Sequence, residues 1–442
     1  MRPRFAAIAR SALLLGAVAM LPVGTAGLAA VDGSVAPKFE RLFQVYQLVK
    51  AHYVDQTDDD KLILGAIDGM LASLDPHSSY LRESSLQQIK TMIEGNYTGL
   101  GISVVPEDGA VKVVSPTRGS PAERAGIKAG DYIPHLDGKY VVDADFDETV
   151  NAMRGPEGSQ IRLTIVRPGR DAPFDLTVTR ATIALEPVSG KLEGSLAVIS
   201  VNQFSADVGR LVFEQLRKLR AAAGGRITGV VLDLRSNPGG ELDEAVALSD
   251  LFLSSGIVVS QRGRQAGENM VYRAETMFTG DAAEGLPVVV LIDVGSASAS
   301  EIVAGALQDQ HRALVMGERS FGKGSVQTTI PIDNSHWLKL TTARYYTPSG
   351  RSIQAGGIEP DIRVPQISDP DARKRNENAL RESDLRRHLV NEKALDDKKL
   401  EQDAKADPRF KMTADELKAK GISDFQMWYA LETLRRTSRG GK

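Results

Sequence analysis

The sequence has no cysteine and almost no excess of either charge. The absence of cysteine in 442 residues excludes disulfides, thiolate metal sites and a lipid anchor on cysteine. The net charge is only −3 at pH 7, which argues against nucleic acid as a bulk electrostatic partner. The residues present, 42% apolar and 25% charged, are ordinary for a globular protein. The length predicts two or three domains with a sizeable core.

The first 30 residues have the pattern of a secretory signal peptide. Three arginines are followed by an apolar run over 12–21 and by small residues at alternate positions before Ala30. An uncleaved membrane anchor is the alternative, because the apolar stretch 11–31 is nearly long enough to span a bilayer. We expect export, with the bacterial periplasm as the location.

A cluster of serines follows the most apolar part of the second half of the chain. The continuous apolar run 287–292 predicts a strand that is buried on both faces. Residues 301–307 partly keep helical spacing. Ser296, Ser298 and Ser300 therefore lie at a strand-to-helix turn. Such a turn can expose a hydroxyl and leaves first-turn N–H groups free to hold an oxyanion.

A serine needs a base before it can act as a nucleophile. His311 is the nearest histidine, but its polar neighbours indicate a surface position. Lys323 is the better candidate because flanking glycines let its backbone approach another element. Burial would lower the pKa of its amine, and the neutral amine can accept a proton. Gln327 shares one face with Lys323 if the segment is extended, and a bend at Gly324 would bring the two side chains together.

Two segments resemble the carboxyl-terminal processing peptidases, also called tail-specific proteases. They read Gly-Ser-Ala-Ser-Ala-Ser-Glu-Ile over 295–302 and Phe-Gly-Lys-Gly-Ser-Val-Gln over 321–327. The family has a Ser/Lys pair and an embedded PDZ domain. The resemblance implies these roles: nucleophile Ser298, base Lys323, assisting amide Gln327, and an oxyanion hole from the N–H groups of Gly240 and Ala299. Asp293-Val294 stands where the family often has Asn-Gly.

A phosphate-binding loop is the main rival interpretation of the lysine segment. Residues 317–323 fit G-x-x-x-x-G-K. The next residue is Gly324 instead of Ser or Thr, and a strand pattern follows instead of a helix, so no helix N-terminus would face the phosphates. We therefore reject nucleotide binding and expect no cofactor and no metal.

A β-rich unit over 95–183 resembles a PDZ domain. Its glycine-containing loop includes Gly99, Leu100, Gly101 and Ile102. The N–H groups of this loop can form a nest for a terminal carboxylate, and the strand 102–105 can pair with a bound peptide. A tight turn without a ligand is the alternative.

Two further features of this unit carry predictions. The pair Pro134-His135 predicts a strand that is bulged or at an edge. A helix pattern over 147–155 contains Arg154 near its C-terminus, where the side chain would complement the helix dipole. We take it as a hypothesis that Arg154 also couples ligand capture to the protease.

The predicted organisation is multidomain, α/β and β. A signal or anchor segment over 1–30 precedes a helical region over 31–94, the PDZ domain over 95–183, a serine protease core over 184–366 and a charged helical tail over 367–442. In the core, strands and helices alternate, which favours an α/β fold. The resemblance implies a crotonase/Clp-like core with an added β-rich part.

These observations together predict a periplasmic serine endopeptidase that binds unstructured protein C-termini and cleaves upstream of them. Its partners would be protein or peptide substrates with free C-termini, a second copy of the chain and an adaptor or activator protein. The alternative is a PDZ-based binding scaffold, or a protease that is inactive without its adaptor.

Overall fold

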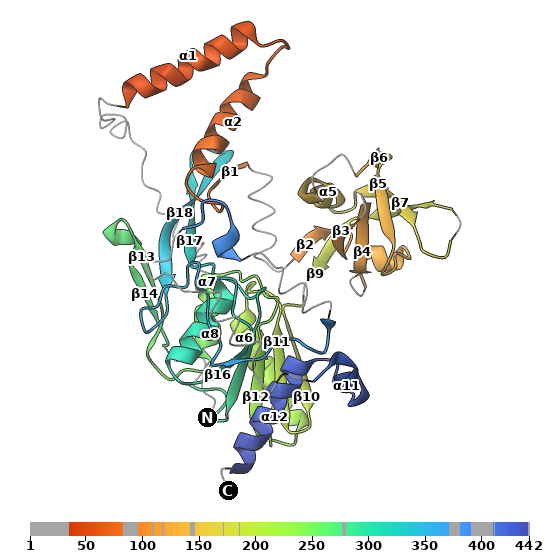
Figure 1. Ribbon diagram of the computed structural model, residues 1–442, viewed down its shortest axis with the longest axis vertical. Helices are drawn as coiled ribbons and strands as arrows, with labels where there is room; N and C mark the ends of the chain where they lie inside the picture. The colour runs from red at the N-terminus through yellow and green to blue at the C-terminus, as the bar shows by residue number, and fades with distance from the viewer. Residues whose placement is uncertain are drawn as a thin grey trace, which may run out of the picture.

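The structure is a computed structural model, and it describes residues 35–82, 96–107, 110–116, 119–141, 146–170, 172–184, 186–275, 280–370, 381–389, 410 and 412–440. Among these residues, none of the helices is long and apolar enough to cross a membrane. The predicted signal segment 1–30 lies outside the described residues. Figure 1 shows the helices, the protease sheet and the PDZ domain in one view.

Two helices, α1 (Ala36–His52) and α2 (Asp59–Ala72), open the described chain, as the helical periodicity predicts. The side chain of Asp58 accepts the N–H of Lys61 and caps α2. Large apolar side chains of α1 remain exposed, among them Phe39, Phe43 and Leu48. An exposed apolar face of this kind is typical of a surface that contacts another molecule.

The PDZ domain is a six-stranded sheet in the order β3-β4-β5-β7-β8, with β6 paired to β5. Its elements are β3 (Ile102–Glu107), β4 (Ala110–Pro116), α4 (Pro121–Arg124), β5 (Tyr132–Leu136), β6 (Lys139–Tyr140), α5 (Phe146–Met153), β7 (Gln160–Val166) and β8 (Phe174–Thr179). The register of β5 against β7 shifts between Tyr132 and His135, so the predicted irregularity at Pro134-His135 is a bulge in an inner strand. The helix ends at Met153, just before Arg154.

The PDZ domain enters and leaves the rest of the chain at one place. Strands β2 (Asn96–Gly99) and β9 (Ala181–Ala184) form an antiparallel pair at its two ends. The domain is therefore an insertion that is closed at its base.

A six-stranded sheet forms the protease core, in the order β10-β11-β12-β15-β16-β19. The strands are β10 (Val188–Glu193), β11 (Leu196–Val201), β12 (Gly229–Asp233), β15 (Val288–Ile292), β16 (Leu314–Gly317) and β19 (Ile362–Arg363). Only β10 is antiparallel to its neighbour. All five residues of β15 are buried, as expected of a central parallel strand.

Helices cover both faces of this sheet. The helices α6 (Val208–Ala222), α7 (Leu242–Asp250) and α8 (Ala299–Asp309) contribute to the larger apolar core. On the other face, α11 (Ala414–Ala419) and α12 (Phe425–Gly440) bury a second apolar cluster, and α12 contacts β12, β15 and β16. In Figure 1, α12 runs along the core sheet near the C-terminus. The C-terminal helix is therefore part of the protease body.

A second sheet of five strands forms the added β-rich part. Its order is β1-β18-β13-β14, with β17 also paired to β18. The elements are β1 (Ser79–Arg82), β13 (Ile257–Gly263), η2 (Ala266–Glu268), β14 (Met270–Arg273), β17 (Ser325–Pro331) and β18 (His336–Tyr346). Strands β17 and β18 form an antiparallel pair. Since β1 precedes the PDZ domain, this sheet joins the N-terminal region to the protease.

The charged tail includes an ordered, packed segment, which the sequence does not indicate. The stretch from Asp369 to Asp407 reads as a solvated helix or a disordered segment. Within it, η3 (Glu382–Asp384) is described, and the side chain of Glu382 is fully buried. Most of the rest of that stretch lies outside the described residues.

Candidate active site

The serine cluster lies between the end of β15 and the first turn of α8, as predicted. Ser296 is buried, and its Oγ donates to the carbonyl of Leu234 at 2.8 Å. Ser300 is also buried, and its Oγ donates to the carbonyl of Asn237 at 2.9 Å. These two hydroxyls hold the turn in place. Ser298, by contrast, is partly exposed.

Ser298 has a backbone conformation that L-residues rarely adopt, with φ 54° and ψ −110°. It directly precedes the first residue of α8. A non-glycine residue in such a region persists only where its surroundings hold it, and this is common at functional sites. The sharp turn places the hydroxyl at the positive end of an 11-residue helix.

A buried carboxylate holds the serine turn against the lysine loop. Oε2 of Glu301 accepts the N–H of Ser298 at 2.8 Å and the N–H of Lys323 at 2.9 Å. Its Oε1 accepts the Ser320 hydroxyl at 2.5 Å and the N–H of Gly322 at 2.7 Å. Burial raises the pKa of Glu301 to about 7, while these four donors oppose the rise. The predicted nucleophile and the predicted base thus share one anchor.

Lys323 lies just before β17, between two glycines. Burial lowers the pKa of its amine, and the nearby charge of Lys339 lowers it further. The carboxylates of Glu382 and Glu301 act in the opposite direction. The net effect favours the neutral amine, which is the form that a general base requires.

Gln327 lies on β17, just after a bulge between Val326 and Gln327. Its Nε2 donates to Ser325 Oγ at 2.9 Å and to Thr341 Oγ1 at 3.4 Å. No hydrogen bond joins Gln327 to Lys323 within the described part of the chain. Its role in orienting the amine stays a prediction.

The turn after β12 lies against the serine. A Cβ added to Gly239 would lie 2.9 Å from the Cβ of Ser298. The next residue, Gly240, forms an isolated parallel bridge with Phe204. Its two neighbours make the bonds to Phe204, which donates to the carbonyl of Gly239 at 3.0 Å and accepts the N–H of Glu241 at 2.8 Å. The N–H of Gly240 therefore points away from Phe204.

Two main-chain N–H groups at this place have no acceptor among the residues that the structure describes. They belong to Gly240 and to Ala299, the first residue of α8. The first N–H groups of a helix have no partner inside the helix. Two such donors beside a serine are what an oxyanion hole requires.

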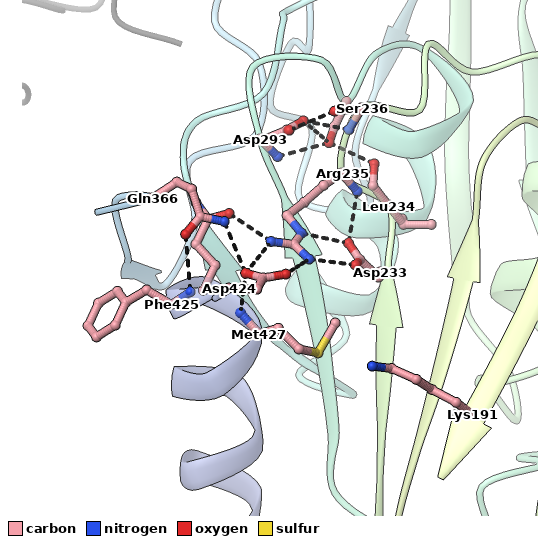
Figure 2. Close-up of polar contacts among 12 residues, drawn as sticks. Lys191, Asp233, Leu234, Arg235, Ser236, Asp293, Gln366, Asp424, Phe425 and Met427 are labelled. Carbon is pink, nitrogen blue, oxygen red and sulfur yellow. Dashed lines mark hydrogen bonds and ion pairs between the residues drawn. The ribbon is translucent and has the colours of Figure 1, made fainter. Parts of the chain in front are cut away.

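A charged network ties the same turn to the C-terminal helix (Figure 2). Arg235 follows β12, and its guanidinium bonds to Asp233 at 2.7 Å and to Asp424 at 2.8 Å. Asp424 also accepts the N–H of Met427 at 3.0 Å, which caps α12. Burial lowers the pKa of Arg235, but its two carboxylate partners raise it by more. The pKa of Arg235 is therefore above its ordinary value.

Asp293 binds the other side of the turn after β12, at Ser236 (Figure 2). The carboxylate accepts the N–H of Ser236 at 2.7 Å and the hydroxyl of Ser236 at 3.1 Å. It also accepts the N–H of Gly295 at 3.0 Å. Asp293, which stands where the family often has Asn, thus joins the serine turn to the turn after β12 that contains Gly239 and Gly240.

The loop Gly99–Ile102 of the PDZ domain connects β2 to β3. Gly101 has φ 75°, and a Cβ there would lie 2.3 Å from the Cβ of Ser120. Leu100 is buried, and its carbonyl accepts the N–H of Ala122 at 2.9 Å. Strand β3 pairs with β4 only, among the described strands of this sheet, so one of its edges is open.

The histidines and Asp309 are not part of the serine site. His311 is exposed, as predicted. The carboxylate of Asp309 accepts the N–H of Ser349 at 2.9 Å and bonds to Arg351 at 2.6 Å, so it ties the end of α8 to the turn after β18. His77 lies in the bend between α2 and β1, and it contacts Glu382 at 2.9 Å.

The chain matches three family models. Peptidase family S41 matches residues 195–364, a PDZ domain matches residues 112–167, and the N-terminal domain of the activating protease CtpB matches residues 26–85. The chain is 44% identical over 357 residues to the carboxy-terminal-processing protease of Bartonella bacilliformis, covering 80% of this chain and 81% of that protein. The chain belongs to the carboxy-terminal processing proteases. It is therefore a serine-type peptidase.

Other relatives agree with this membership. The chain is 36% identical to the carboxy-terminal processing protease CtpA of Bacillus subtilis, covering 74% of this chain and 69% of that protein. Among solved structures, the photosystem II D1 C-terminal processing protease is 28% identical, with a TM-score of 0.49 over 74% of this chain and 87% of that one. The structure itself has the predicted mixed α/β fold with a PDZ domain.

Sequence reasoning missed several residues that hold the site of this protease. Glu301 belongs to the serine motif, and Ser-x-x-Glu before an apolar run is the signature of a capping box that could have identified it. Asn237 had no signal beyond its place in a turn. Gln354 accepts the N–H of Gly324 at 3.0 Å and donates to Glu382 at 2.8 Å. The segment 347–354 that ends in Gln354 resembles the family but gave no role to this residue, and no pattern points to Glu382.

Proposed function

We propose that this protease is an exported, periplasmic endopeptidase that holds unstructured C-terminal tails in its PDZ domain and cleaves upstream of them. Ser298 is the nucleophile, Lys323 the base, Gln327 the residue that orients the amine, and the N–H groups of Gly240 and Ala299 the oxyanion hole. The observation that carries this proposal is the shared Glu301 oxygen, which anchors the main chains of Ser298 and Lys323.

The chemistry follows from these positions. The neutral amine of Lys323 takes the hydroxyl proton of Ser298 while Oγ bonds to the substrate carbonyl carbon. The carbonyl oxygen becomes an oxyanion, and the two free N–H groups stabilise it. The C–N bond then breaks, and the ammonium of Lys323 gives its proton to the leaving amine. Water enters with Lys323 again as base and releases the acyl group from Ser298.

Tail recognition uses the PDZ domain. The N–H groups of the Gly99–Ile102 loop face the terminal carboxylate, and the open edge of β3 pairs with the last residues of the substrate. The insertion of the domain between β1 and β10 allows a long tail to reach from the loop to Ser298. The exposed apolar face of α1 supports contact with a second copy or an activator.

The test compares wild type, Ser298→Ala and Lys323→Ala on one unfolded protein substrate, with and without an apolar C-terminus. We expect cleavage by the wild type only, and faster cleavage of the substrate with the apolar tail. Cleavage that survives in Ser298→Ala would overturn the assignment of the nucleophile. Cleavage that ignores the tail would remove the recognition model. An inactive wild type that an added partner activates would favour the adaptor-dependent alternative.

A further inference from the structure

Part of the charged tail lies against the loop that carries Lys323. We call residues 381–389 the tail strap and residues 319–324 the base loop. The strap is separated from the base loop by about sixty residues of sequence and by strands β17 and β18. Its central element is η3, and its start faces the main chain of the base loop.

The strap holds three successive carbonyls of the base loop. The guanidinium of Arg381 donates to the carbonyl of Arg319 at 3.0 Å and to that of Ser320 at 3.2 Å. The N–H of Glu382 donates to the carbonyl of Phe321 at 3.2 Å. Two residues of the tail thus fix the side of the loop opposite to the N–H groups that Glu301 holds.

The Glu382 side chain, which is 0% exposed, reaches the base loop by a second route. Its Oε1 accepts the amide of Gln354 at 2.8 Å, and Oε1 of Gln354 accepts the N–H of Gly324 at 3.0 Å. His77 Nε2 lies 2.9 Å from both carboxylate oxygens of Glu382. A buried carboxylate lowers the stability of the fold unless it is paired and hydrogen-bonded. Gln354 and His77 provide such partners for Glu382.

Four charged groups surround the amine of Lys323 or its neighbours. Glu382 of the strap and Glu301 of α8 favour its protonated form, whereas Lys339 of β18 disfavours it. Asp75 in turn acts on Lys339. Glu301 accepts one donor from the serine turn and three from the base loop. Of the two carboxylates, Glu382 raises the pKa of Lys323 more.

We propose that Glu382 is a positioning residue for the base, supplied by the tail strap, which holds the base loop and stabilises the ammonium that forms when Lys323 takes the serine proton. The inference rests on the proposed function, because it requires Lys323 to be the base. It assigns to the tail a direct part in the reaction, in the way that a carboxylate behind a catalytic base stabilises the charged base.

The test is the pH dependence of kcat and KM for the full chain, on one unfolded substrate, for wild type and Glu382→Gln. Glu214→Gln, an exposed substitution of the same kind on α6, is the matched control. We expect Glu382→Gln to lower kcat by roughly 10- to 100-fold with little change in KM. Loss of the charge should also move the acid limb of the profile to lower pH, by about half a pH unit or more. The control should match the wild type.

Two results would overturn the inference. One is wild-type kcat in Glu382→Gln. The other is a kcat that is lower by the same factor at every pH, with the acid limb at its wild-type position. That result would show that Glu382 only supports the structure of the base loop. If Glu382→Gln does not fold by circular dichroism, Glu382→Met, which also removes the charge, replaces it, and an unmoved limb there equally contradicts the inference. Activity retained in Ser298→Ala would instead refute the proposed function, so the two failures are distinguishable.

Discussion

Ser298 and Lys323 donate their main-chain N–H groups to the same oxygen atom, Oε2 of Glu301. This oxygen fixes Ser298, at the start of α8, relative to Lys323, in the loop before β17. Their side chains need not touch for this. A displacement of about 1 Å in such a geometry can cost a factor of about 10² in rate. The shared anchor explains why the strained backbone of Ser298 is held in place.

Replacing the nucleophile should remove activity without removing the fold. We expect Ser298→Ala to lower kcat by at least about 10⁴-fold, because the side chain is partly exposed and contributes little to packing. Ser296→Ala and Ser300→Ala are matched controls. Ser296→Ala loses two buried hydrogen bonds and Ser300→Ala loses one, so each should lose about 1 to 3 kcal/mol of unfolding free energy and keep the chemistry. Loss of activity only in a control would move the assignment to another serine.

Glu301→Gln should impair the reaction more than substrate binding. An amide can present only one oxygen to the four donors that the carboxylate accepts, and its NH₂ would face N–H groups. We expect kcat to fall by about 10²-fold with KM nearly unchanged and with a native circular dichroism spectrum. Wild-type kcat in this variant would show that the shared anchor is dispensable.

The rate should follow the protonation of Lys323. Burial lowers the pKa of Lys323, and only the neutral amine acts as a base. The profile of kcat/KM should therefore rise with pH through an apparent pKa below the ordinary lysine value of about 10.4. Lys323→Arg should be inactive at every pH, because a guanidinium stays protonated. A profile that does not change with pH in the wild type would contradict this.

Gly240 should not tolerate a side chain. A Cβ at this position would lie 2.0 Å from the carbonyl oxygen of Phe204, and φ is +147°. We expect Gly240→Ala to lower both the thermal midpoint and kcat. Gly224→Ala is the control, because Gly224 also has positive φ but nothing within 4 Å. It should cost only about 1 to 2 kcal/mol of stability and leave kcat unchanged.

The ion pair between Arg235 and Asp424 should stabilise the protein at neutral pH. The guanidinium and other donors lower the pKa of Asp424 to about 2, against about 4 in the unfolded chain. The stabilisation is thus complete above the unfolded pKa and is lost as the pH falls toward about 2.

Asp424→Asn tests this directly. It should lower the unfolding free energy at pH 7 by roughly 1 to 2 kcal/mol, since the carboxylate is partly exposed. The difference from wild type in denaturant titrations should shrink below about pH 4. A difference that is constant from pH 7 to pH 3 would contradict the assigned cause.

Local patterns were enough to predict the elements of the protease core. The apolar run before the serines became β15 because a strand buried on both faces has no polar positions. The strand after Lys323 and the helices of the N-terminal region likewise follow from short-range patterns. The serine and lysine motifs could be recognised because each lies within one short segment.

Long-range contacts could not be predicted in this way. The contact of Glu382 with the base loop joins segments about sixty residues apart, and the contact of Arg235 with Asp424 joins residues 189 positions apart. A charge-dense sequence such as 369–407 reads as solvated, because charge alone does not indicate which residue will find a buried partner. The role of the tail therefore emerged only from the structure.

The most direct test of the Ser298–Lys323 pair is the rate at which a serine-directed phosphonate modifies the protein, followed by peptide mass mapping, in wild type and Lys323→Ala. The account predicts one adduct, on Ser298, forming faster as the pH rises and almost absent in Lys323→Ala. An adduct on a different serine, or equal labelling of Ser298 in Lys323→Ala, would contradict it.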